Sequence, residues 1–314
     1  MDVPTRSVRG VDGSNIVVYE AGEGPLVLLS HGFPELAYSW RHQIPALVDA
    51  GYRVAAPDQR GYGASDRPDA IDAYDIDHLT GDLVNILDAL GEEKAVFVGH
   101  DWGSMVVWQS ALLVPDRVAG VVGMSVPFAP RSEHPPTQIW RHVFGDSFFY
   151  ILYFQEPGVA DADLGRDAAT TMRRLLAGMG SSDLAPSVGD DAGFVDRFPE
   201  PDGLPDWLTQ DELDHYAGEF SRTGFTGGIN WYRNFDRNWE RHPELAGARV
   251  TVPSLFIGGS ADPVLQMVDP EANVSWLDDH RGNVLVDGAG HWVQQERPDE
   301  VNTALIAFLR ELDW

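Results

Sequence analysis

The stretch that decides the fold is Ala95-Val96-Phe97-Val98-Gly99-His100-Asp101-Trp102-Gly103. Residues 95–98 form a short apolar run, which is typical of a strand buried on both faces of a sheet. Helical spacing follows as far as Leu113, so a sharp turn must join this strand to this helix. Gly99 and Gly103 leave room for such a turn because neither carries a side chain, and the turn projects Asp101 above the sheet.

The alternation of short apolar runs with helical spacing continues on both sides of this stretch. Further strands are predicted at residues 16–19, 26–29, 52–56, 118–124, 254–257 and 283–286, and helices at 38–50, 77–90 and from 298 to 312. Such alternation implies parallel strands joined by crossover helices, with the strands buried between helical layers. We therefore predict an α/β fold with a mostly parallel central sheet and helices on both faces.

Residues 127–246 interrupt this pattern. They are rich in aromatic residues, arginine and proline, and they show helical spacing without a strand signal at 148–154, 168–177 and 209–220. A helical insertion at the carboxyl ends of parallel strands would cover the crevice in which such sheets bind ligands. We therefore predict a core domain, residues 1–126 and 247–314, and an inserted helical cap domain, residues 127–246, that acts as a lid. Within the cap, the glycine- and proline-rich residues 178–205 are predicted to form a long loop.

The composition excludes several classes of function. The 314 residues include no cysteine, which rules out disulfides, thiolate nucleophiles and iron–sulfur clusters. The 22 basic and 49 acidic residues give a net charge of −27, which disfavours binding to nucleic acids and to anionic membrane surfaces. The sequence shows no apolar leader near its start and no run of the roughly 18 apolar residues that a membrane span needs. These features favour a cytoplasmic enzyme.

Asp101 stands at the position of the strand-to-helix turn from which a nucleophile could act. The positive end of the following helix favours an anion there. A carboxylate can attack an sp³ carbon and form an alkyl ester, which water must then cleave. An esterase would need serine at this position, and Ser104 lies one residue beyond Gly103. The alternative is that Asp101 only caps the helix.

A base for the second step is found in the loop Gly288-Ala289-Gly290-His291-Trp292, shortly before the final helix. Asp262 follows the preceding predicted strand and can hold the imidazole of His291 in one tautomer and stabilise its charged form. Its alternative role is to cap its own loop. The order nucleophile, acid, histidine is the one expected of an α/β-hydrolase fold, and the other acid position holds Ser125 and Val126. Three further histidines are expected to serve packing or loop hydrogen bonds, His31, His42 and His100.

Several motifs agree in order and spacing with those of one known family. In the core they are His31-Gly32-Phe33-Pro34-Glu35, Asp58-Gln59-Arg60-Gly61-Tyr62-Gly63, the turn at 99–103, and Gly290-His291-Trp292. In the insertion they are Phe149-Tyr150-Ile151-Leu152-Tyr153-Phe154-Gln155-Glu156-Pro157-Gly158 and Asn230-Trp231-Tyr232-Arg233-Asn234. With these motifs the chain resembles the epoxide hydrolase branch of the α/β-hydrolase family along nearly its full length. The resemblance implies the hydrolysis of an epoxide to a vicinal diol, in keeping with a role in detoxification.

The resemblance also implies that Tyr150 and Tyr232 are the acids that open the epoxide ring. Ring opening develops alkoxide charge on the epoxide oxygen, and two phenol O–H groups that face the nucleophile can hydrogen-bond and protonate it. Tyr153 is a rival for the role of Tyr150, because it lies three residues away on the same helical face. Tyr232 lies among aromatic residues that include Trp231 and Phe235, so its alternative role is packing between cap and core.

Backbone N–H groups of Phe33 and Trp102 are expected to stabilise the tetrahedral oxyanion that forms on Asp101 during ester cleavage. The resemblance suggests a cis bond between Phe33 and Pro34, which proline makes accessible. The substrate pocket is predicted to be lined by aromatic side chains: Phe33, Trp102, Tyr153, Phe154, Trp231 and Trp292. The expected reactants are an apolar epoxide and water, with no metal, no cofactor, and neither nucleic acid nor membrane as a partner. The sequence is compatible with a homo-oligomer but does not determine the oligomeric state.

Two other functions remain as alternatives. Haloalkane dehalogenases share an aspartate nucleophile followed by tryptophan, but they typically place asparagine after His-Gly, where this chain has Phe33, and they lack the two cap tyrosines. The second alternative is a non-catalytic small-molecule receptor on the same scaffold, since a fold does not by itself imply a function. Such receptors often lose members of the catalytic triad, whereas nucleophile, base and acid are all present in this sequence.

Overall fold

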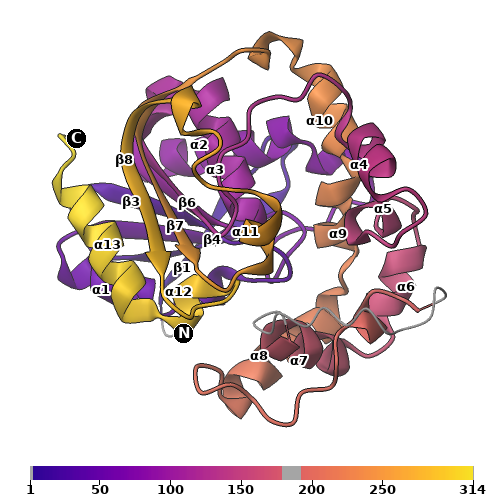
Figure 1. The fold of residues 1–314 in the computed structure, drawn as a ribbon. Coiled ribbons are helices and arrows are strands. Elements are labelled where there is room, and N and C mark those ends of the chain that lie inside the picture. The colour runs from indigo at the N-terminus through magenta and orange to yellow at the C-terminus, as the bar shows by residue number, and fades with distance from the viewer. Residues whose placement is uncertain (1–2, 179–191, 314) are drawn as a thin grey trace.

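A computed structural model describes residues 3–178 and 192–313 of the chain (Figure 1). Its centre is an eight-stranded sheet with the order β1-β2-β4-β3-β5-β6-β7-β8. Strand β2 pairs antiparallel with β1 and with β4, and the other neighbouring strands are parallel. The strands are β1 (Thr5–Arg9), β2 (Asn15–Ala21), β3 (Leu26–Ser30), β4 (Arg53–Asp58), β5 (Ala95–His100), β6 (Val118–Met124), β7 (Val250–Gly259) and β8 (Leu277–Val286). The predicted α/β fold with a mostly parallel sheet is confirmed.

Helices cover both faces of the sheet, and β3 shows how one strand packs against both layers. Leu26 and Leu28 belong to the apolar cluster on the face of α2 (Ile76–Leu90) and α3 (Trp102–Leu113). Val27 and Leu29 belong to the cluster on the face of α1 (Gln43–Asp49) and α13 (Pro298–Arg310). Successive residues of a strand point to opposite faces. An uninterrupted apolar run therefore predicts a strand that is buried on both sides, as β3 is.

The structure differs from the prediction at β1 and at residues 38–50. The sequence pattern does not predict β1, because four of its five residues are exposed and it contains no apolar run. The predicted single helix at 38–50 is wrong: a 3₁₀-helix at Ala37–Trp40 precedes α1. The physical reason is Pro45, whose ring would clash with the carbonyl group of Arg41 in a continuous α-helix.

Between β6 and β7, every element in the described residues is helical. The helices are α4 (Pro136–Phe144), α5 (Tyr150–Tyr153), α6 (Val159–Gly165), α7 (Ala168–Gly178), α8 (Gln210–Thr223), α9 (Thr226–Arg233) and α10 (Phe235–Arg241), with short 3₁₀ turns. Figure 1 shows them gathered beside the sheet, apart from the core helices. The helical spacing at 168–177 and 209–220 corresponds to α7 and α8, whereas that at 148–154 gives only the short α5. Of the predicted loop at 178–205, residues 179–191 lie outside the described residues, and the part that follows contains the 3₁₀-helix Val195–Arg197.

The remaining core helices are short and lie at the carboxyl ends of the last two strands. Helix α11 (Pro263–Met267) follows β7, and α12 (Val293–Glu296) follows β8. They stand directly after Asp262 and two residues after His291. Within residues 3–178 and 192–313, no helix combines the length and the apolar character that crossing a membrane requires.

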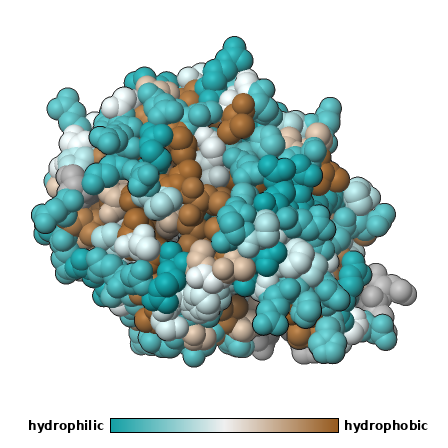
Figure 2. Space-filling model, turned by 90° about the horizontal axis from the view of Figure 1, so that it is seen from above, coloured by the Kyte–Doolittle hydropathy of each residue, from teal (hydrophilic) through white to brown (hydrophobic). Residues whose placement is uncertain are grey.

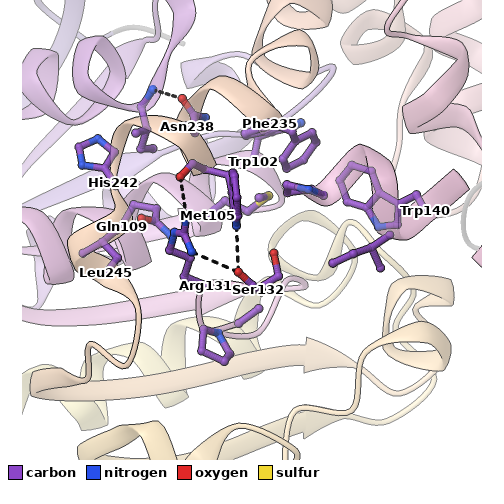
Figure 3. Close-up of a pocket in the computed structure, with 16 residues that line it drawn as sticks. Trp102, Met105, Gln109, Arg131, Ser132, Trp140, Phe235, Asn238, His242 and Leu245 are labelled. Atoms are coloured by element: carbon purple, nitrogen blue, oxygen red, sulfur yellow. Dashed lines mark hydrogen bonds between the residues drawn. The ribbon is translucent and has the colours of Figure 1, made fainter. Parts of the chain in front are cut away.

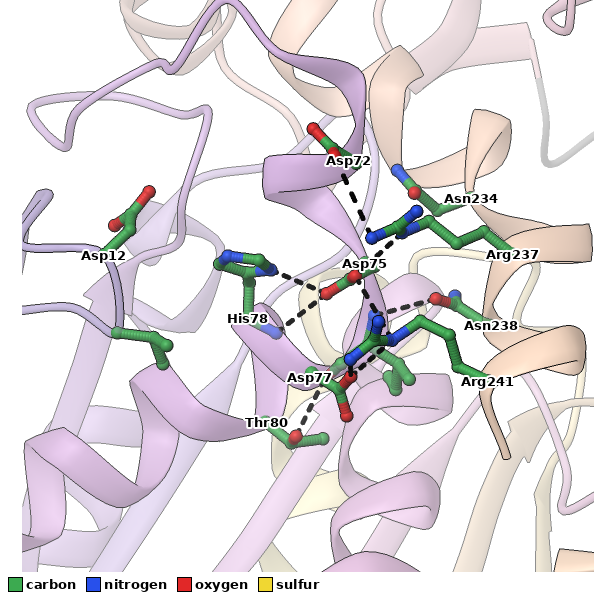
Figure 4. A network of polar contacts seen from close by, with 12 residues as sticks. Asp12, Asp72, Asp75, Asp77, His78, Thr80, Asn234, Arg237, Asn238 and Arg241 are labelled. Atoms are coloured by element: carbon green, nitrogen blue, oxygen red, sulfur yellow. Dashed lines mark hydrogen bonds and ion pairs between the residues drawn. The ribbon is translucent and has the colours of Figure 1, made fainter. Parts of the chain in front are cut away.

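Helix α10 is tied to the start of α2 by a network of ion pairs (Figure 4). Nε of Arg237 lies 3.0 Å from Oδ2 of Asp75, and Nε of Arg241 lies 2.6 Å from Oδ2 of Asp77. The two arginines belong to the helical insertion and the two aspartates to the core. The network therefore fixes the last insertion helix against the layer that carries α2 and α3.

Candidate active site

Asp101 lies at the turn between β5 and α3. Its backbone has a φ of 52° and a ψ of −118°, a conformation that L residues rarely adopt and that the surrounding structure must enforce. A Cβ on Gly103 would come within 1.9 Å of the carbonyl oxygen of Ser30, and a Cβ on Gly99 within 2.1 Å of the carbonyl oxygen of Gly103. Neither glycine can be replaced without moving the turn.

The carboxylate of Asp101 does not act as a helix cap. It accepts no hydrogen bond from the first turn of α3. Oδ1 instead accepts a hydrogen bond from the backbone N–H of Phe33 at 2.8 Å. The bond between Phe33 and Pro34 is cis, as the resemblance suggests. The helix-cap alternative for Asp101 is therefore not supported, and the carboxylate is available for chemistry.

His291 lies between two carboxylates. Its Nδ1 lies 3.2 and 3.1 Å from Oδ1 and Oδ2 of Asp262, and its Nε2 lies 3.7 Å from Oδ2 of Asp101. Asp262 also accepts a hydrogen bond from the N–H of Val264 at 2.9 Å, so it caps its loop and contacts the imidazole at the same time. Burial alone would lower the pKa of His291, but Asp262 and Asp101 outweigh burial and raise this pKa well above its ordinary value. The charged imidazolium is therefore favoured in the free protein.

A buried polar network holds the loop that carries His291. The carbonyl oxygen of His291 accepts hydrogen bonds from Oγ of Ser125 at 2.7 Å and from Nε2 of His100 at 2.8 Å. Nδ1 of His100 lies 2.7 Å from Oε2 of Glu35. Burial raises the pKa of Glu35, but the adjacent His100 outweighs burial and lowers it to about 2.

The expectation that His100 makes loop hydrogen bonds is confirmed. The sequence patterns do not reveal the parts that Glu35 and Ser125 play in this network. The one signal in the sequence is that Glu35 ends the motif that follows a buried strand, because a glutamate buried at such a place needs a partner.

A cavity of about 310 Å³ adjoins Asp101. Its lining comes from the core and from the helical insertion: Phe33, Pro34, Asp101, Phe144, Phe148, Phe149, Tyr150, Leu175, Phe194, Arg197, Phe198, Tyr232, Pro263, Val264, Met267 and His291. Four of the five predicted catalytic residues lie at this cavity, Asp101, His291, Tyr150 and Tyr232. The fifth, Asp262, lies directly behind His291.

The two predicted tyrosines are neighbours in the lining of this cavity. Tyr150 opens α5 and Tyr232 lies in α9, with ring centroids 5.9 Å apart. Burial and the nearby charge of Asp101 raise the pKa of both phenols, so both keep their protons near neutral pH. The rival, Tyr153, does not line the cavity, and its hydroxyl group donates to Oδ2 of Asp163 at 3.3 Å. Tyr232 also packs against Trp102 with centroids 5.0 Å apart, so it serves packing as well.

The predicted pocket lining needs correction, because only Phe33 of the six predicted side chains lines this cavity. Trp102 lines a different cavity (Figure 3), and its ring packs against that of Tyr232. Phe154 is fully buried under Tyr232, with centroids 5.0 Å apart. The indole N–H groups of the other two tryptophans donate to backbone carbonyls, that of Trp231 to Arg60 and that of Trp292 to Leu175, and Tyr153 points to Asp163.

The physical reason for this error is helical geometry. Consecutive residues of a helix point about 100° apart, so Trp231 faces the core when its neighbour Tyr232 faces the cavity. The apolar lining that the prediction misses comes from segments far apart in the sequence, such as Phe194 and Met267. No local pattern marks these residues as neighbours.

Comparisons with known proteins identify the class of this chain. Residues 25–298 match the family model described as the alpha/beta hydrolase fold. Epoxide hydrolase A of Mycobacterium tuberculosis (strain ATCC 25618 / H37Rv) is 59% identical over 100% of this chain and 99% of its own length. Epoxide hydrolase 2 of Siraitia grosvenorii is 41% identical over 96% of both chains. The chain therefore belongs to the α/β-hydrolase fold family, and within that family it is an epoxide hydrolase.

Solved structures agree with this assignment. The crystal structure of Epoxide Hydrolase A from Mycobacterium thermoresistibile has 62% sequence identity and a TM-score of 0.95, and the match covers 99% of both chains. An epoxide hydrolase from an endophytic Streptomyces has 46% identity and a TM-score of 0.92, over 98% of this chain and 95% of that one. The predicted family, fold class and enzyme class are confirmed, and epoxide hydrolase is favoured over the dehalogenase and receptor alternatives.

Proposed function

We propose that the enzyme converts an apolar epoxide to a vicinal diol through a covalent alkyl ester on Asp101. The observation that carries the proposal is that Asp101, His291, Tyr150 and Tyr232 line one cavity. Most of the remaining lining consists of phenylalanine and other apolar side chains. Such a lining favours an apolar substrate with a few polar groups around the reacting centre.

In the first step, the epoxide oxygen accepts hydrogen bonds from Tyr150 and Tyr232 while Asp101 attacks a ring carbon from the opposite side. The new bond joins a carboxylate oxygen to carbon, and the carbon–oxygen bond of the ring breaks. A phenol donates its proton to the alkoxide that forms. The raised pKa values of both tyrosines support this role, because a donor must still hold its proton at the working pH.

In the second step, water attacks the carbonyl carbon of the ester and His291 takes the proton from that water. Asp262 stabilises the resulting imidazolium. The charge that develops on the Asp101 oxygen is stabilised by the N–H of Phe33, which lies 2.8 Å from Oδ1. The second proposed donor is the N–H of Trp102, which donates no hydrogen bond to the Asp101 carboxylate in the free protein. The imidazolium of His291 gives its proton to the leaving oxygen as the tetrahedral intermediate collapses, so the diol departs neutral. The proton left on the Asp101 carboxyl group returns through solvent to the tyrosinate, which restores both the carboxylate and the phenol.

The helical insertion, residues 127–246, acts in this proposal as a lid on the core formed by residues 1–126 and 247–314. Both proton-donating tyrosines belong to the insertion, whereas nucleophile and base belong to the core. The insertion also supplies most of the apolar lining of the cavity. Ring opening therefore requires that the insertion and the core keep their relative position.

The base is tested by His291→Gln. This substitution should leave ring opening possible but stop ester cleavage, so the ester accumulates. Intact-protein mass spectrometry with a terminal epoxide should then show a mass increase equal to that of the substrate. The double variant Asp101→Asn/His291→Gln is the matched control and should show no increase. Unimpaired turnover by His291→Gln would refute the assigned base.

The ester route is tested by a single turnover in water labelled with heavy oxygen. Ester cleavage at the carbonyl carbon leaves the oxygen from water in the Asp101 carboxylate. The first diol released therefore carries no label, because its oxygens come from the epoxide and from Asp101. Label in the diol of the first turnover would instead show that water attacks the epoxide ring directly.

A further inference from the structure

The two segments that carry the proposed proton donors are joined by reciprocal hydrogen bonds. Gln155 lies two residues beyond α5, and its Nε2 donates to the carbonyl oxygen of Tyr232 in α9 at 3.0 Å and to that of Ile151 in α5 at 2.9 Å. Both acceptors are carbonyl oxygens, so only the NH₂ group of the amide can face them. One side chain therefore links the helix that begins at Tyr150 to the backbone of Tyr232.

Arg233 makes the return contact from α9. Its Nε donates to the carbonyl oxygen of Phe154 at 3.0 Å and its Nη2 to that of Glu156 at 3.3 Å. These acceptors lie on either side of Gln155. The guanidinium group also pairs with Asp161 of α6, and the side chain of Arg233 is almost fully buried. Charge-assisted hydrogen bonds to a planar guanidinium group are strong and directional. Gln155 and Arg233 thus form a bridge between α5 and α9.

Helix α9 is held directly on the core. The indole N–H of Trp231 donates to the carbonyl oxygen of Arg60 at 3.1 Å. The side-chain amide of Asn234, the residue after α9, donates to the carbonyl oxygen of Ile71 at 2.7 Å. The position of Tyr232 relative to the core is therefore fixed by hydrogen bonds on both sides of it in the sequence.

Helix α5 depends on its neighbours for its position. It has a single turn, Tyr150–Tyr153, and so short a helix is not stable by itself. Within residues 3–178 and 192–313, the hydrogen bonds made by residues 149–156 all end on the helical insertion. The ring of Phe154 packs against that of Phe33 of the core, but such packing is less directional than a hydrogen bond. The directional link between Tyr150 and the core therefore runs through the bridge and α9.

We propose that Gln155 and Arg233 are positioning residues for ring opening, because they hold Tyr150 beside Tyr232 so that both hydroxyl groups reach one epoxide oxygen. The inference rests on the proposed function, in which both phenols donate to that oxygen. Neither bridge side chain lines the catalytic cavity, so each acts through the tyrosines and not on the substrate. A misplacement of about 1 Å can reduce a rate by about 10²-fold, so a shift of α5 is enough to impair ring opening.

The first test is Gln155→Met, which keeps the length of the side chain and removes both donors. The rate of ester formation should fall by about tenfold, because Tyr150 loses its position. The rate of ester cleavage should stay within about twofold of wild type, because its base, His291, belongs to the core. Single-turnover rapid mixing with excess enzyme measures both rates. An unchanged rate of ester formation, or an equal loss in both steps, would overturn the proposal.

The second test uses the difference between the two helices. Loss of the bridge should displace α5, whereas α9 stays on the core. In a Tyr232→Phe background Tyr150 is the remaining donor, so Gln155→Met should still lower kcat/KM by about tenfold. In a Tyr150→Phe background the remaining donor lies on α9, so the further loss should be less than about twofold. A general loss of stability would lower kcat/KM equally in both backgrounds, and that result would contradict the positioning role.

Arg233→Lys tests the other half of the bridge and takes the place of Gln155→Met if that variant does not fold. It keeps a positive charge beside Asp161 but loses the planar group that reaches two carbonyl oxygens. We expect the same selective loss of ester formation and the same dependence on the tyrosine background. Equal losses in the two steps, or in the two backgrounds, would count against the bridge as they do for Gln155→Met.

Thr171→Val is the matched control within the insertion. It removes a buried hydrogen bond, from Oγ1 of Thr171 to the carbonyl oxygen of Leu164 at 2.8 Å, that joins neither tyrosine helix. Both rates should stay within about twofold of wild type, since one neutral hydrogen bond contributes little to the stability of the whole fold. Thermal unfolding shows whether each variant is folded. A selective loss of ester formation in Thr171→Val as large as in Gln155→Met would refute the specific role of the bridge.

Failure of this inference is distinguishable from failure of the proposed function. If His291→Gln traps no ester, the proposed mechanism fails. The comparison of kcat/KM in the two tyrosine backgrounds does not require an ester, so it still decides whether the bridge positions Tyr150. If the ester is trapped but Gln155→Met has the same effect in both backgrounds, the mechanism stands and the role of the bridge is wrong.

Discussion

The imidazole of His291 must be uncharged when it takes a proton from water. In the free protein its charged form is favoured, because Asp262 and Asp101 raise its pKa. Formation of the proposed ester neutralises Asp101 and removes one of the two negative charges beside the ring. The pKa of His291 then falls, and the histidine becomes a competent base only after the nucleophile has reacted.

The substitution Asp101→Asn should produce the same change without substrate. It removes the charge whose Oδ2 lies 3.7 Å from Nε2 of His291, so the pKa of His291 should fall. NMR titration of the histidine ring signals measures this pKa directly. As a comparison, Asp262→Asn removes the other charge and should also lower it. A pKa in Asp101→Asn equal to that of wild type would contradict the proposed coupling.

The two rival tyrosines can be separated by single substitutions. Tyr150→Phe removes a proton donor from the cavity and should lower the rate of ring opening by about 10²-fold. Tyr153→Phe removes only the hydroxyl group that bonds Asp163, and it should leave the rate within about twofold of wild type. Rapid-mixing measurement of ester formation provides the comparison. A larger loss in Tyr153→Phe than in Tyr150→Phe would reverse the assignment, and Tyr150→Phe/Tyr232→Phe should nearly abolish ring opening.

Among the structural elements, the sequence predicts those whose conformation is set by neighbouring residues in the chain. The turn at Asp101 is predictable because its conformation excludes a Cβ on Gly99 and on Gly103. The pocket lining is not predictable in this way, because it depends on how distant helices rotate against the core. The tyrosine pair is identified only through the resemblance to the family motifs. Strand β1 shows a further limit, since an exposed edge strand held by pairing to β2 needs no apolar pattern.

Asp75, which caps the start of α2 and pairs with Arg237 of α10, should stabilise the protein. Its side chain is almost fully buried, it accepts a hydrogen bond from the N–H of His78 at 3.1 Å, and it pairs with Arg237. Asp75→Asn should lower the free energy of unfolding at neutral pH by about 1–3 kcal/mol, which urea denaturation measures. The matched control is Asp72→Asn, because Asp72 is exposed and lies 3.8 Å from Arg237, and it should cost at most about 0.5 kcal/mol.

The pH dependence of this contribution has a definite sign. Burial raises the pKa of Asp75, but hydrogen bonds from His78 and Arg237 outweigh burial and lower it below the ordinary value of 3.8. A carboxyl group with a lowered pKa in the folded state stabilises the protein fully above the unfolded pKa and loses that effect as pH falls through the folded pKa. The difference between wild type and Asp75→Asn should therefore narrow in acid. A constant difference from neutral pH into acid would show that the charge of Asp75 is not responsible.

At the scale of the whole molecule, the topology assembles the site from distant parts of the chain. Asp101, Asp262 and His291 follow β5, β7 and β8, and the carboxyl ends of these parallel strands meet at one edge of the sheet. Tyr150 and Tyr232 reach the same place from the helical insertion. The position of the insertion on the core is therefore part of the catalytic geometry. An effect that changes the stability of the whole fold also affects the site.

The net charge of −27 acts on the whole fold. Hydrophilic side chains surround a hydrophobic group near the middle of the face shown in Figure 2. Acidic residues outnumber basic ones by 49 to 22, so repulsion between carboxylates opposes the folded state. An increase of NaCl from about 0.01 M to about 1 M shortens the Debye length from about 30 Å to about 3 Å and should screen this repulsion. We expect Tm to rise, by about 2 °C for each kcal/mol gained.

Calorimetry in NaCl and in sucrose distinguishes the causes of such a rise. Sucrose stabilises by exclusion from the protein surface and does not screen charge. A larger rise in NaCl than in sucrose of equal osmolarity would support relief of repulsion. A fall of Tm in NaCl would mean that salt weakens attractive ion pairs, such as those between α10 and α2, more than it relieves repulsion. Ion pairs taken together, the network of Figure 4 among them, would then contribute more to stability than repulsion removes.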